Sequence, residues 1–295
     1  MVTADGRFIT ASNKENNDLF WGLRGGGGNF VIVTSFEFKL HPVSTVFAGP
    51  ILYSLQEARG AMRLYREYMA KAPDDMSGLF SFLVVPPGPP FPDHLHNKTV
   101  CGVVCCYAGP TEKAEEVIRP LRKFGPPIFE YRGHTPYPAL QSALDALVPF
   151  GLQYYWKADF VKELIDDAIE VHLKYGPDIA KYNSALYIYP TSGAAHRVKK
   201  DETAFNHRDA DFVHVIASAN SDPADTPKNS EWVREYWSAL HPYSAGGAYL
   251  NFMMEEGENR IKATYGDNYE RLVQIKNKYD PTNLFRVNQN IKPTV

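Results

Sequence analysis

Few cysteines and no long apolar run occur in the sequence. No apolar stretch in its 295 residues approaches the ~20 residues that cross a bilayer, so the sequence predicts no membrane span. Its three cysteines, Cys101, Cys105 and Cys106, lie in one short apolar segment, and three neighbouring cysteines do not make a disulfide framework. We expect buried free thiols, with Cys101 and Cys105 on one face of a strand and Cys106 on the other.

A strong charge of either sign is also absent. The formal net charge is −3, from 31 basic and 34 acidic residues, which argues against a nucleic acid or an anionic membrane as partner. The N-terminus lacks a basic region followed by an apolar core, so the sequence predicts no signal peptide and favours a cytoplasmic location. With 44% hydrophobic residues, the chain can bury a large core.

Four consecutive glycines, Gly25, Gly26, Gly27 and Gly28, are the most unusual feature that is present. Glycine permits positive φ and lets a ligand approach the backbone closely. Two nucleotide-binding motifs are nevertheless absent: no Gly-Lys-Ser/Thr follows the run, and a Gly-x-Gly-x-x-Gly frame that starts at Gly25 meets Phe30 where glycine is needed. By itself the run predicts a flexible turn that leads into a strand.

The hydrophobic pattern predicts an α+β fold, in which strands and helices follow one another without an internal repeat. A short hairpin is expected over Val2–Ser12, with its turn at Asp5-Gly6. Further strands are expected over 30–40, 50–55, 79–85, 99–107, 154–161, 184–189, 211–219 and 248–253. Helices are expected over 13–20, 55–71, 111–121, 137–147, 164–175, 233–240 and 268–279.

The residues around the glycines form a far more specific pattern. The run NNDLFWGLRGGGGNF at 16–30, followed by TSFEF at 34–38, closely resembles FAD-linked oxidases of the berberine bridge enzyme type. The same resemblance holds for YLNF at 249–252, YGDNYERL at 265–272 and KNKYDPTNLFRVNQNI at 276–291. Because two long motifs occur in the right order, the resemblance covers the whole chain.

This resemblance implies a domain organisation. A large antiparallel sheet with helices on one face would form a substrate-binding domain over 45–250, and the open face of that sheet would roof the active site. Residues 1–44 would be a remnant of the flavin-binding domain, and 251–295 would return to it. In the resembling proteins a further domain precedes this part. Its Arg-x-Gly-Gly-His motif, whose histidine can bond covalently to the flavin, does not occur here, so we expect no covalent FAD.

FAD is the cofactor that the resemblance implies. It places the cofactor-binding residues at Gly25 to Gly28, Asn29, Asn288 and Gln289. Where the family usually has glycine after Asn-Phe, this sequence has Val31, and we expect the valine Cβ to hinder close approach of a ligand.

Two positions near the C-terminus are candidates for catalysis. Tyr249 lies two residues before Asn251, so both would point to one face of the expected strand. The resemblance implies that this tyrosine faces flavin and substrate and acts as general base. A phenol with a reference pKa of ~10 needs help from a cation or a hydrogen bond to do so. The alternative is that Tyr249 is a core residue whose hydroxyl donates a hydrogen bond to a neighbouring acceptor.

Four aromatic residues, Tyr154, Trp156, Tyr187 and Tyr189, alternate along two expected strands, as they would in a substrate-facing wall. His214 is a further candidate for lining the pocket. The alternative is a core or surface histidine whose hydrogen-bonding groups already have partners. The segment 93–96, Asp-His-Leu-His, has no third ligand group nearby, so no metal site is expected.

Two functions remain open. One is the flavin-dependent oxidation of a small organic, natural-product-like molecule of secondary metabolism. The other is a cofactor-free cyclase or isomerase that retains the substrate pocket and acts by orientation alone. A chain without activity of its own is a third possibility. Since the terminal segments carry many apolar residues, we also expect the chain to form a homodimer.

Overall fold

The computed structural model describes residues 1–123, 125–143, 145, 148–287 and 289–295. These form two compact units. The first, which we call the sheet unit, comprises 42–193 and 210–244. The second, the terminal unit, comprises 1–41, 194–209 and 245–295.

The sheet unit contains an eight-stranded antiparallel sheet in the order β6-β3-β5-β4-β9-β10-β8, with β7 also paired to β3. Its strands are β3 (Thr45–Tyr53), β4 (Met76–Val84), β5 (Thr99–Tyr107), β6 (Phe129–Glu130), β7 (Gly133–Pro136), β8 (Gln153–Val161), β9 (Ser184–Pro190) and β10 (Phe212–Asn220). The large antiparallel sheet expected from the resemblance is thus confirmed.

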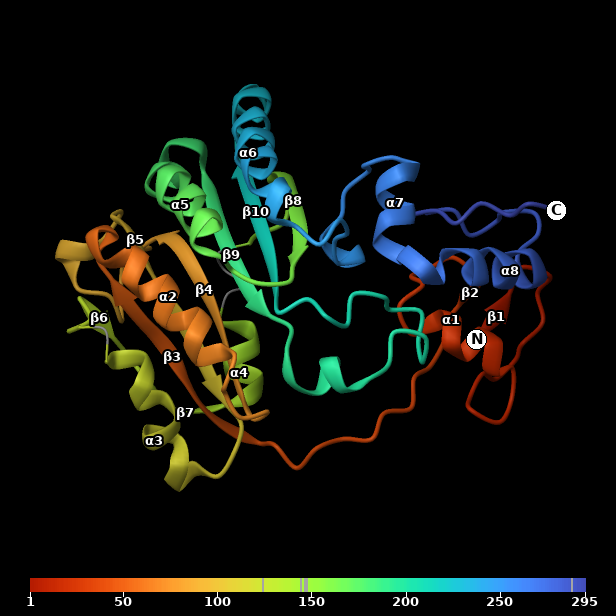
Figure 1. Cartoon of the computed structure of the whole chain (residues 1–295), viewed down its shortest axis with the longest axis horizontal. Coiled ribbons are helices and arrows are strands. Elements are labelled where there is room, and N and C mark those ends of the chain that lie inside the picture. The colour runs from red at the N-terminus through yellow and green to blue at the C-terminus, as the bar shows by residue number, and fades with distance from the viewer. Residues whose placement is uncertain (124, 144, 146–147, 288) are drawn as a thin grey trace. The chain divides into compact units, whose positions relative to one another are not determined.

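Helices cover one face of this sheet (Figure 1). The helices of the unit are α2 (Ala58–Met69), α3 (Ala114–Ile118), α4 (Tyr137–Ser142), α5 (Asp166–Tyr175) and α6 (Thr226–Leu240). Residues 144, 146 and 147 of the helix expected over 137–147 lie outside the described residues. The apolar stripes of α2, α3, α5 and α6 pack with alternate strand residues into one core.

Strand β5 shows how the sequence selects the face. Cys101, Val103 and Cys105 are buried in the helix-covered core, while Cys106 points to the opposite face and is only half-buried. All three cysteines are free thiols, as expected. The core also holds the Tyr65 hydroxyl, which lies 2.9 Å from the carbonyl oxygen of Gly78 and 2.9 Å from that of Ile188. This phenol therefore bridges strands β4 and β9 from helix α2.

In the terminal unit the two ends of the chain share a second core. Its elements are β1 (Val2–Thr3), α1 (Asn17–Leu23), β2 (Val31–Ile32), α7 (Glu258–Tyr265) and α8 (Tyr269–Tyr279). Leu19, Trp21 and Phe30 from the N-terminal segment pack against Leu272 and Ile291. The helix expected over 268–279 is confirmed by α8.

Residues 194–209 join this unit through backbone contacts that no sequence pattern marks. Trp21 Nε1 donates to the carbonyl oxygen of Asp201 at 2.7 Å. Asn268 Nδ2 donates to the carbonyl oxygen of Lys200 at 3.0 Å. The sequence predicts instead that this segment belongs to the central 45–250 region.

Two strand predictions in the terminal unit are wrong. Of the strand expected over 30–40, only Val31–Ile32 pairs with another strand, namely β1, and the following residues are extended without a ladder. Of the strand expected over 248–253, the structure has a single 3₁₀ turn, Leu250–Phe252. The hairpin over Val2–Ser12 is present as a turn and one bridge between Val2 and Phe8.

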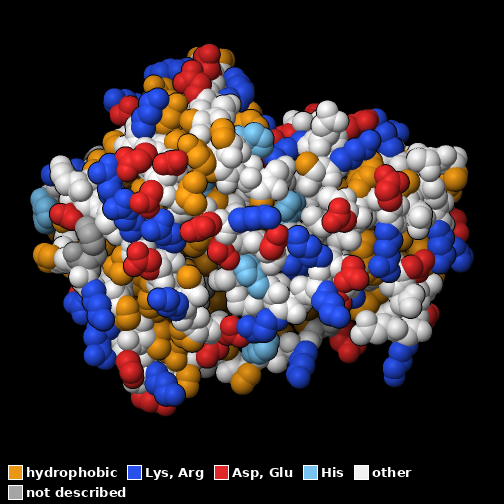
Figure 2. All heavy atoms as spheres, viewed as in Figure 1, with side chains coloured by type: hydrophobic (Ala, Val, Ile, Leu, Met, Phe, Trp, Pro, Cys, Tyr) orange, Lys and Arg blue, Asp and Glu red, His pale blue; other side chains and the backbone are white. Residues whose placement is uncertain are grey.

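The surface carries charges of both signs. Figure 2 shows Lys and Arg side chains interspersed with Asp and Glu over the face in view, without a continuous region of one sign. None of the helices in the described part of the chain has the length and apolar character that crossing a bilayer requires.

Candidate functional site

The sheet unit brings the four predicted aromatic residues to one face. Trp156 pairs with Ala217 of β10, and Tyr187 pairs with Val215 of the same strand. Because directly paired residues of an antiparallel sheet point to the same side, Tyr154, Trp156, Tyr187 and Tyr189 all lie on the face opposite the helices. We call these four half-buried residues the aromatic wall.

The aromatic wall consists of two ring pairs. The ring centres of Tyr187 and Tyr189 are 6.2 Å apart, and those of Tyr154 and Trp156 are 6.4 Å apart. Burial raises the pKa of Tyr187, and burial together with the neighbouring Tyr187 raises the pKa of Tyr189 to about 12. Both phenols therefore stay neutral at physiological pH, which suits contact with an uncharged ring rather than proton abstraction.

His214 does not belong to this wall, so its prediction as a substrate-lining residue is wrong. It pairs with Ile188 and points into the helix-covered core, where its side chain is 3% exposed. Its ring centre lies 4.8 Å from that of His172 on α5, and burial lowers the pKa of His214 to about 3. His214 is thus a neutral core residue.

In the terminal unit, the side chains of Tyr249 and Asn251 lie together, but a 3₁₀ turn and not the predicted strand positions them. The 3₁₀ turn that begins after Tyr249 brings the two side chains together, and Asn251 Nδ2 donates to the Tyr249 hydroxyl oxygen at 2.8 Å. The Tyr249 ring packs edge-on against Phe252 and Phe205, with centres 5.2 and 6.4 Å away. Tyr249 remains 36% exposed, so its hydroxyl is accessible.

The four glycines of the turn serve different purposes. A Cβ at Gly25, where φ is +126°, would lie 2.3 Å from the backbone nitrogen of Phe205, and one at Gly26 would lie 2.4 Å from the carbonyl oxygen of Gly22. Gly27 has φ +70°. At Gly28 a Cβ would meet nothing within 4 Å. Gly25 and Gly26 are therefore required by internal packing, whereas the exposed backbone of Gly27 and Gly28 is open to a ligand.

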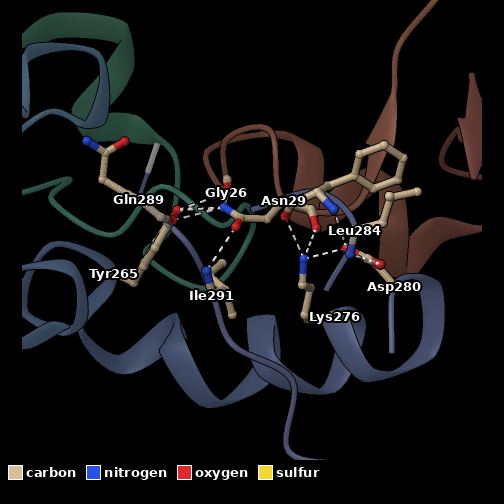
Figure 3. A network of polar contacts seen from close by, with 9 residues as sticks. Gly26, Asn29, Tyr265, Lys276, Asp280, Leu284, Gln289 and Ile291 are labelled. Atoms are coloured by element: carbon tan, nitrogen blue, oxygen red, sulfur yellow. Dashed lines mark hydrogen bonds and ion pairs between the residues drawn. The ribbon is translucent and has the colours of Figure 1, made fainter. Parts of the chain in front are cut away.

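Asn29 uses its side chain inside the unit (Figure 3). Its Nδ2 lies 2.8 Å from the carbonyl oxygen of Gly26 and 3.2 Å from that of Gln289, and its Oδ1 accepts from the backbone N–H of Ile291 at 2.9 Å. The Gln289 side chain also points inward and donates to the carbonyl oxygen of Met253 at 3.0 Å. The amides of Asn29 and Gln289 thus connect segments of the unit, and the third predicted amide, Asn288, lies outside the described residues.

A buried ion pair, which the sequence reasoning did not single out, completes this network. Lys276 and Asp280 have fully buried side chains, and Lys276 Nζ lies 2.6 Å from Asp280 Oδ2. The ammonium also donates to the carbonyl oxygens of Asn29 at 2.8 Å and Phe285 at 2.7 Å, so all three of its hydrogens are used. A Lys and an Asp four residues apart at the end of an apolar helix stripe were the available signal.

Hydrogen bonds and burial set the pKa values of this ion pair. Burial opposes ionisation of Asp280, but donation by Lys276 and by the backbone N–H groups of Phe285 and Leu284 outweighs it, so the pKa of Asp280 lies below its ordinary value. Burial lowers the pKa of Lys276, and the hydrogen bond to Asp280 partly offsets this. The pair fixes the turn after α8 against the end of the glycine segment.

Val31 does not obstruct the surface of the turn, contrary to the prediction. Its side chain is buried in the core of the terminal unit, beside Phe30. A glycine at this position would remove core volume. It would not open a ligand surface.

Only part of the set predicted to bind FAD is open to a ligand. The backbone of Gly27 and Gly28 fits close approach of a ligand, whereas Gly25, Gly26, Asn29 and Gln289 are used in internal packing and hydrogen bonds. Within the described ranges, no cluster of three or more His, Cys, Asp and Glu side chains is arranged to bind a metal ion.

Comparison with known proteins gives a family. Residues 248–292 match the family model described as "Berberine and berberine like". An FAD-linked oxidoreductase of Dictyostelium discoideum is 31% identical over 297 aligned residues, which include 99% of this chain and 62% of that protein. Over almost its whole length the chain is similar to FAD-linked oxidases of the berberine bridge enzyme type. It spans less than two thirds of the length of this relative.

Solved structures of berberine bridge enzyme-like proteins share the fold. The wild-type BBE-like 1 protein of Physcomitrella patens superposes with a TM-score of 0.83 at 21% identity, over 99% of this chain and 64% of that one. A carbohydrate oxidase of Microdochium nivale, solved with a substrate analogue, gives a TM-score of 0.80 at 21% identity, over 100% of this chain and 65% of that one. In this chain, the family-model match includes Tyr249, Asn251, Lys276 and Asp280.

Proposed function

We propose that the chain carries the substrate-binding part of a flavin-dependent oxidase that acts on a small organic, natural-product-like molecule with a ring. The aromatic wall is the observation that supports this proposal most directly. Four half-buried aromatic side chains on the sheet face opposite the core offer a broad apolar surface with neutral hydroxyl groups, which suits a flat or cyclic substrate. The FAD-linked oxidoreductase among its relatives supports the redox chemistry.

In this proposal the aromatic wall binds and orients the substrate ring. Tyr187 and Tyr189 keep their protons because burial raises the pKa of both, so they contribute stacking surface and hydrogen bonds. Orientation of this kind places the reacting bond and lowers the entropic part of the barrier. FAD, when bound, would accept the hydride that an oxidised substrate loses.

We assign to Tyr249 the role of accepting the proton that the substrate releases on oxidation. Oxidation of an alcohol or amine releases a proton together with the hydride, and an exposed phenol oxygen can take that proton when it is deprotonated. The Asn251 amide already donates to this oxygen at 2.8 Å. This hydrogen bond holds the Tyr249 oxygen in a fixed position beside Asn251.

The exposed backbone of Gly27 and Gly28 is the part of this chain that we assign to the cofactor. A Gly28→Val variant places a branched side chain on this surface without an internal clash, since a Cβ there meets nothing within 4 Å. We expect weaker binding of added FAD, measured by quenching of flavin fluorescence, and an unchanged melting temperature. Equal FAD binding by the variant would remove this backbone from the site, and turnover without any flavin would instead favour the cofactor-free cyclase.

The catalytic assignment has its own test. Tyr249→Phe should lower turnover by roughly 10²–10⁴-fold, the usual effect of losing a positioned acid or base, and should preserve folding because only a hydroxyl is removed. Tyr131→Phe is the matched control, since Tyr131 is 60% exposed and lies outside the aromatic wall. Full activity of the Tyr249 variant under saturating FAD would exclude it as the base.

A further inference from the structure

Helices α5 and α6 carry a group of aromatic residues that the proposed oxidase chemistry does not use. The two helices lie side by side on the sheet unit (Figure 1). Tyr236 of α6 is fully buried, and its hydroxyl lies 2.7 Å from Nδ1 of His172 on α5. The core of the sheet unit therefore contains a phenol in direct contact with a nitrogen base.

The hydrogen bond between these two side chains runs from Tyr236 to His172. A phenol, with a reference pKa of ~10, is the better donor, and an imidazole nitrogen, with a reference pKa of ~6.5, is the better acceptor. Burial raises the pKa of Tyr236 well above its ordinary value and lowers the pKa of His172 well below its own. At rest, the proton therefore stays on the phenol and the imidazole is neutral.

A series of rings leads from Tyr236 to half-buried positions. Tyr175 stacks on Tyr236, with ring centres 4.7 Å apart and ring planes inclined by 11°. The Trp232 ring, one helical turn before Tyr236, lies 5.4 Å from it, and Tyr182 stacks on Trp232 at 4.7 Å. Tyr175 and Tyr182 are half-buried. Tyrosine and tryptophan are the aromatic side chains that lose an electron most readily, so each ring in this series can pass one on.

We propose that Tyr236 is a site of reversible one-electron oxidation and that His172 takes its proton. The neighbouring rings carry the electron to a one-electron oxidant at the surface, such as a radical derived from hydrogen peroxide. Oxidising equivalents that reach this surface are then held at one buried residue. This activity goes beyond the proposed oxidase function and does not depend on a bound flavin.

The oxidation couples the loss of one electron to the movement of one proton. The oxidant is reduced by one electron from a half-buried ring, and an electron from Tyr236 refills that ring. The O–H bond of Tyr236 breaks as its proton forms a bond to His172 Nδ1, which leaves a neutral phenoxyl radical and an imidazolium. An oxidised phenol is a far stronger acid than a neutral one, so the proton moves only when the electron leaves.

The surroundings of His172 make the step reversible. The ring centre of His214 lies 4.8 Å from that of His172, and burial lowers the pKa of His214 to about 3, so His214 adds no like charge. A buried imidazolium is nevertheless costly. When one electron returns through the same rings, the proton therefore moves back to the Tyr236 oxygen and the resting pair is restored.

Tyr65 provides an internal comparison. It is equally buried in the same core, but its hydroxyl lies 2.9 Å from each of two backbone carbonyl oxygens, which are far weaker bases than an imidazole. Its ring packs against Phe80 and Phe212, and phenylalanine is much harder to oxidise than tyrosine or tryptophan. We therefore expect the radical at Tyr236 and not at Tyr65.

Flash photolysis of the full chain tests this expectation, with ruthenium tris(bipyridine) as the photo-oxidant. A laser flash in the presence of a sacrificial electron acceptor produces the ruthenium(III) complex, which removes one electron from the protein surface. The wild-type chain should give a long-lived phenoxyl radical, detected by absorption and by electron paramagnetic resonance, because a buried radical is protected from coupling with others. Tyr236→Phe should lose most of this long-lived signal, and the matched control Tyr65→Phe should keep it.

Two further measurements address the route and the proton. Combining Trp232→Phe with Tyr175→Phe should suppress the Tyr236 radical although the pair with His172 is retained, because both neighbouring rings then resist oxidation. In heavy water, radical formation in the wild-type chain should be slower, because a proton moves together with the electron. The isotope effect is measured on the unaltered chain, so it does not depend on how the variants fold.

Other results would overturn the proposal. A wild-type chain without a long-lived phenoxyl radical, or a Tyr236→Phe variant with an undiminished one, excludes Tyr236 as the site. Equal rates in light and heavy water exclude the proton transfer to His172. Since these measurements need neither flavin nor substrate, their outcome is independent of whether the chain is an oxidase.

Discussion

Lys276 is an unusual residue because a lysine is rarely buried completely. Its ammonium is compensated by one carboxylate and two carbonyl oxygens, all within 2.8 Å. A buried ion pair contributes little net stability compared with apolar residues of the same size, but removing one partner leaves a charge buried and uncompensated. Such a pair therefore makes the surrounding segments depend on one another.

Lys276→Met should destabilise the terminal unit by about 3–5 kcal/mol, since it leaves the Asp280 carboxylate buried without its cation. Urea denaturation followed by hydrogen exchange in peptides from α8 measures this directly. Lys278→Met is the matched control on the same helix, because its ion pair with Asp18 is largely exposed and should change stability by less than about 1 kcal/mol. Equal effects of the two substitutions would contradict the structural role of the buried pair.

Single residues were predictable where the chemistry is local. Tyr249 and Asn251 are close enough in sequence that either a strand or a 3₁₀ turn brings them together, so the pair was found although the element was wrong. His214 failed for a different reason. Its neighbours Val213 and Val215 are as apolar as Phe212, so alternation alone does not show which side of β10 faces the helices.

At the scale of elements, the glycine turn makes a sharp test of backbone geometry. Gly25→Ala should destabilise the terminal unit by about 1–3 kcal/mol, because its φ of +126° is unfavourable for alanine and its Cβ would meet the backbone of Phe205. Gly28→Ala should stay within about 0.5 kcal/mol of the wild type, because there is open space around that position. Thermal unfolding of the two variants measures this difference in stability. Equal unfolding midpoints would show that the four glycines form only a flexible loop.

Elements with a strong internal pattern were found reliably, and elements that depend on a partner were not. Strand β5 and helix α8 were placed almost to the residue, because each has a buried face with regular spacing. The segment after Ile32 has the alternation of a strand, but nothing in the described chain pairs with it. Periodicity reports which faces are apolar. It does not report whether a second strand is present to complete the ladder.

For the whole molecule, long motifs were more informative than local propensity. The patterns at 16–38 and 249–291 gave the family and the antiparallel sheet, whereas the inclusion of 194–209 in the terminal unit had no sequence signal. That segment is attached by hydrogen bonds from Trp21 and Asn268 to backbone carbonyl groups, which any residue type supplies. Contacts of this kind are decided by the fold.

The two units also differ in how they should respond to acid. The sheet unit contains the buried histidines His172 and His214, whose pKa values burial holds below the ordinary range. Their ring centres lie 4.8 Å apart, and the Tyr236 hydroxyl lies 2.7 Å from His172 Nδ1. The terminal unit contains one histidine of this kind, His207, and the carboxyl of Asp280, whose pKa is lowered.

The sign of each contribution follows from linkage. A histidine that stays neutral when folded takes up a proton on unfolding below pH ~6.5, so each one costs about 1.4 kcal/mol per pH unit as the pH falls further. Asp280 has the opposite window, because its contribution is present above its unfolded pKa of ~3.9 and is lost only below it. Between pH 6.5 and 4.5 the sheet unit, which has two such histidines, should therefore lose more stability than the terminal unit.

Hydrogen exchange at pH 7.5 and 5.0, corrected for the intrinsic exchange rate, should show β10 and α5 losing protection to a greater extent than α8. His214→Leu should reduce the acid sensitivity of the sheet unit by about half, because one of its two proton-accepting groups is removed. His94→Leu is the matched control, since His94 is exposed on the same unit and should leave the pH profile unchanged. If the His214 variant loses protection with acid as steeply as the wild-type chain, the buried histidine pair is not the origin of the acid response.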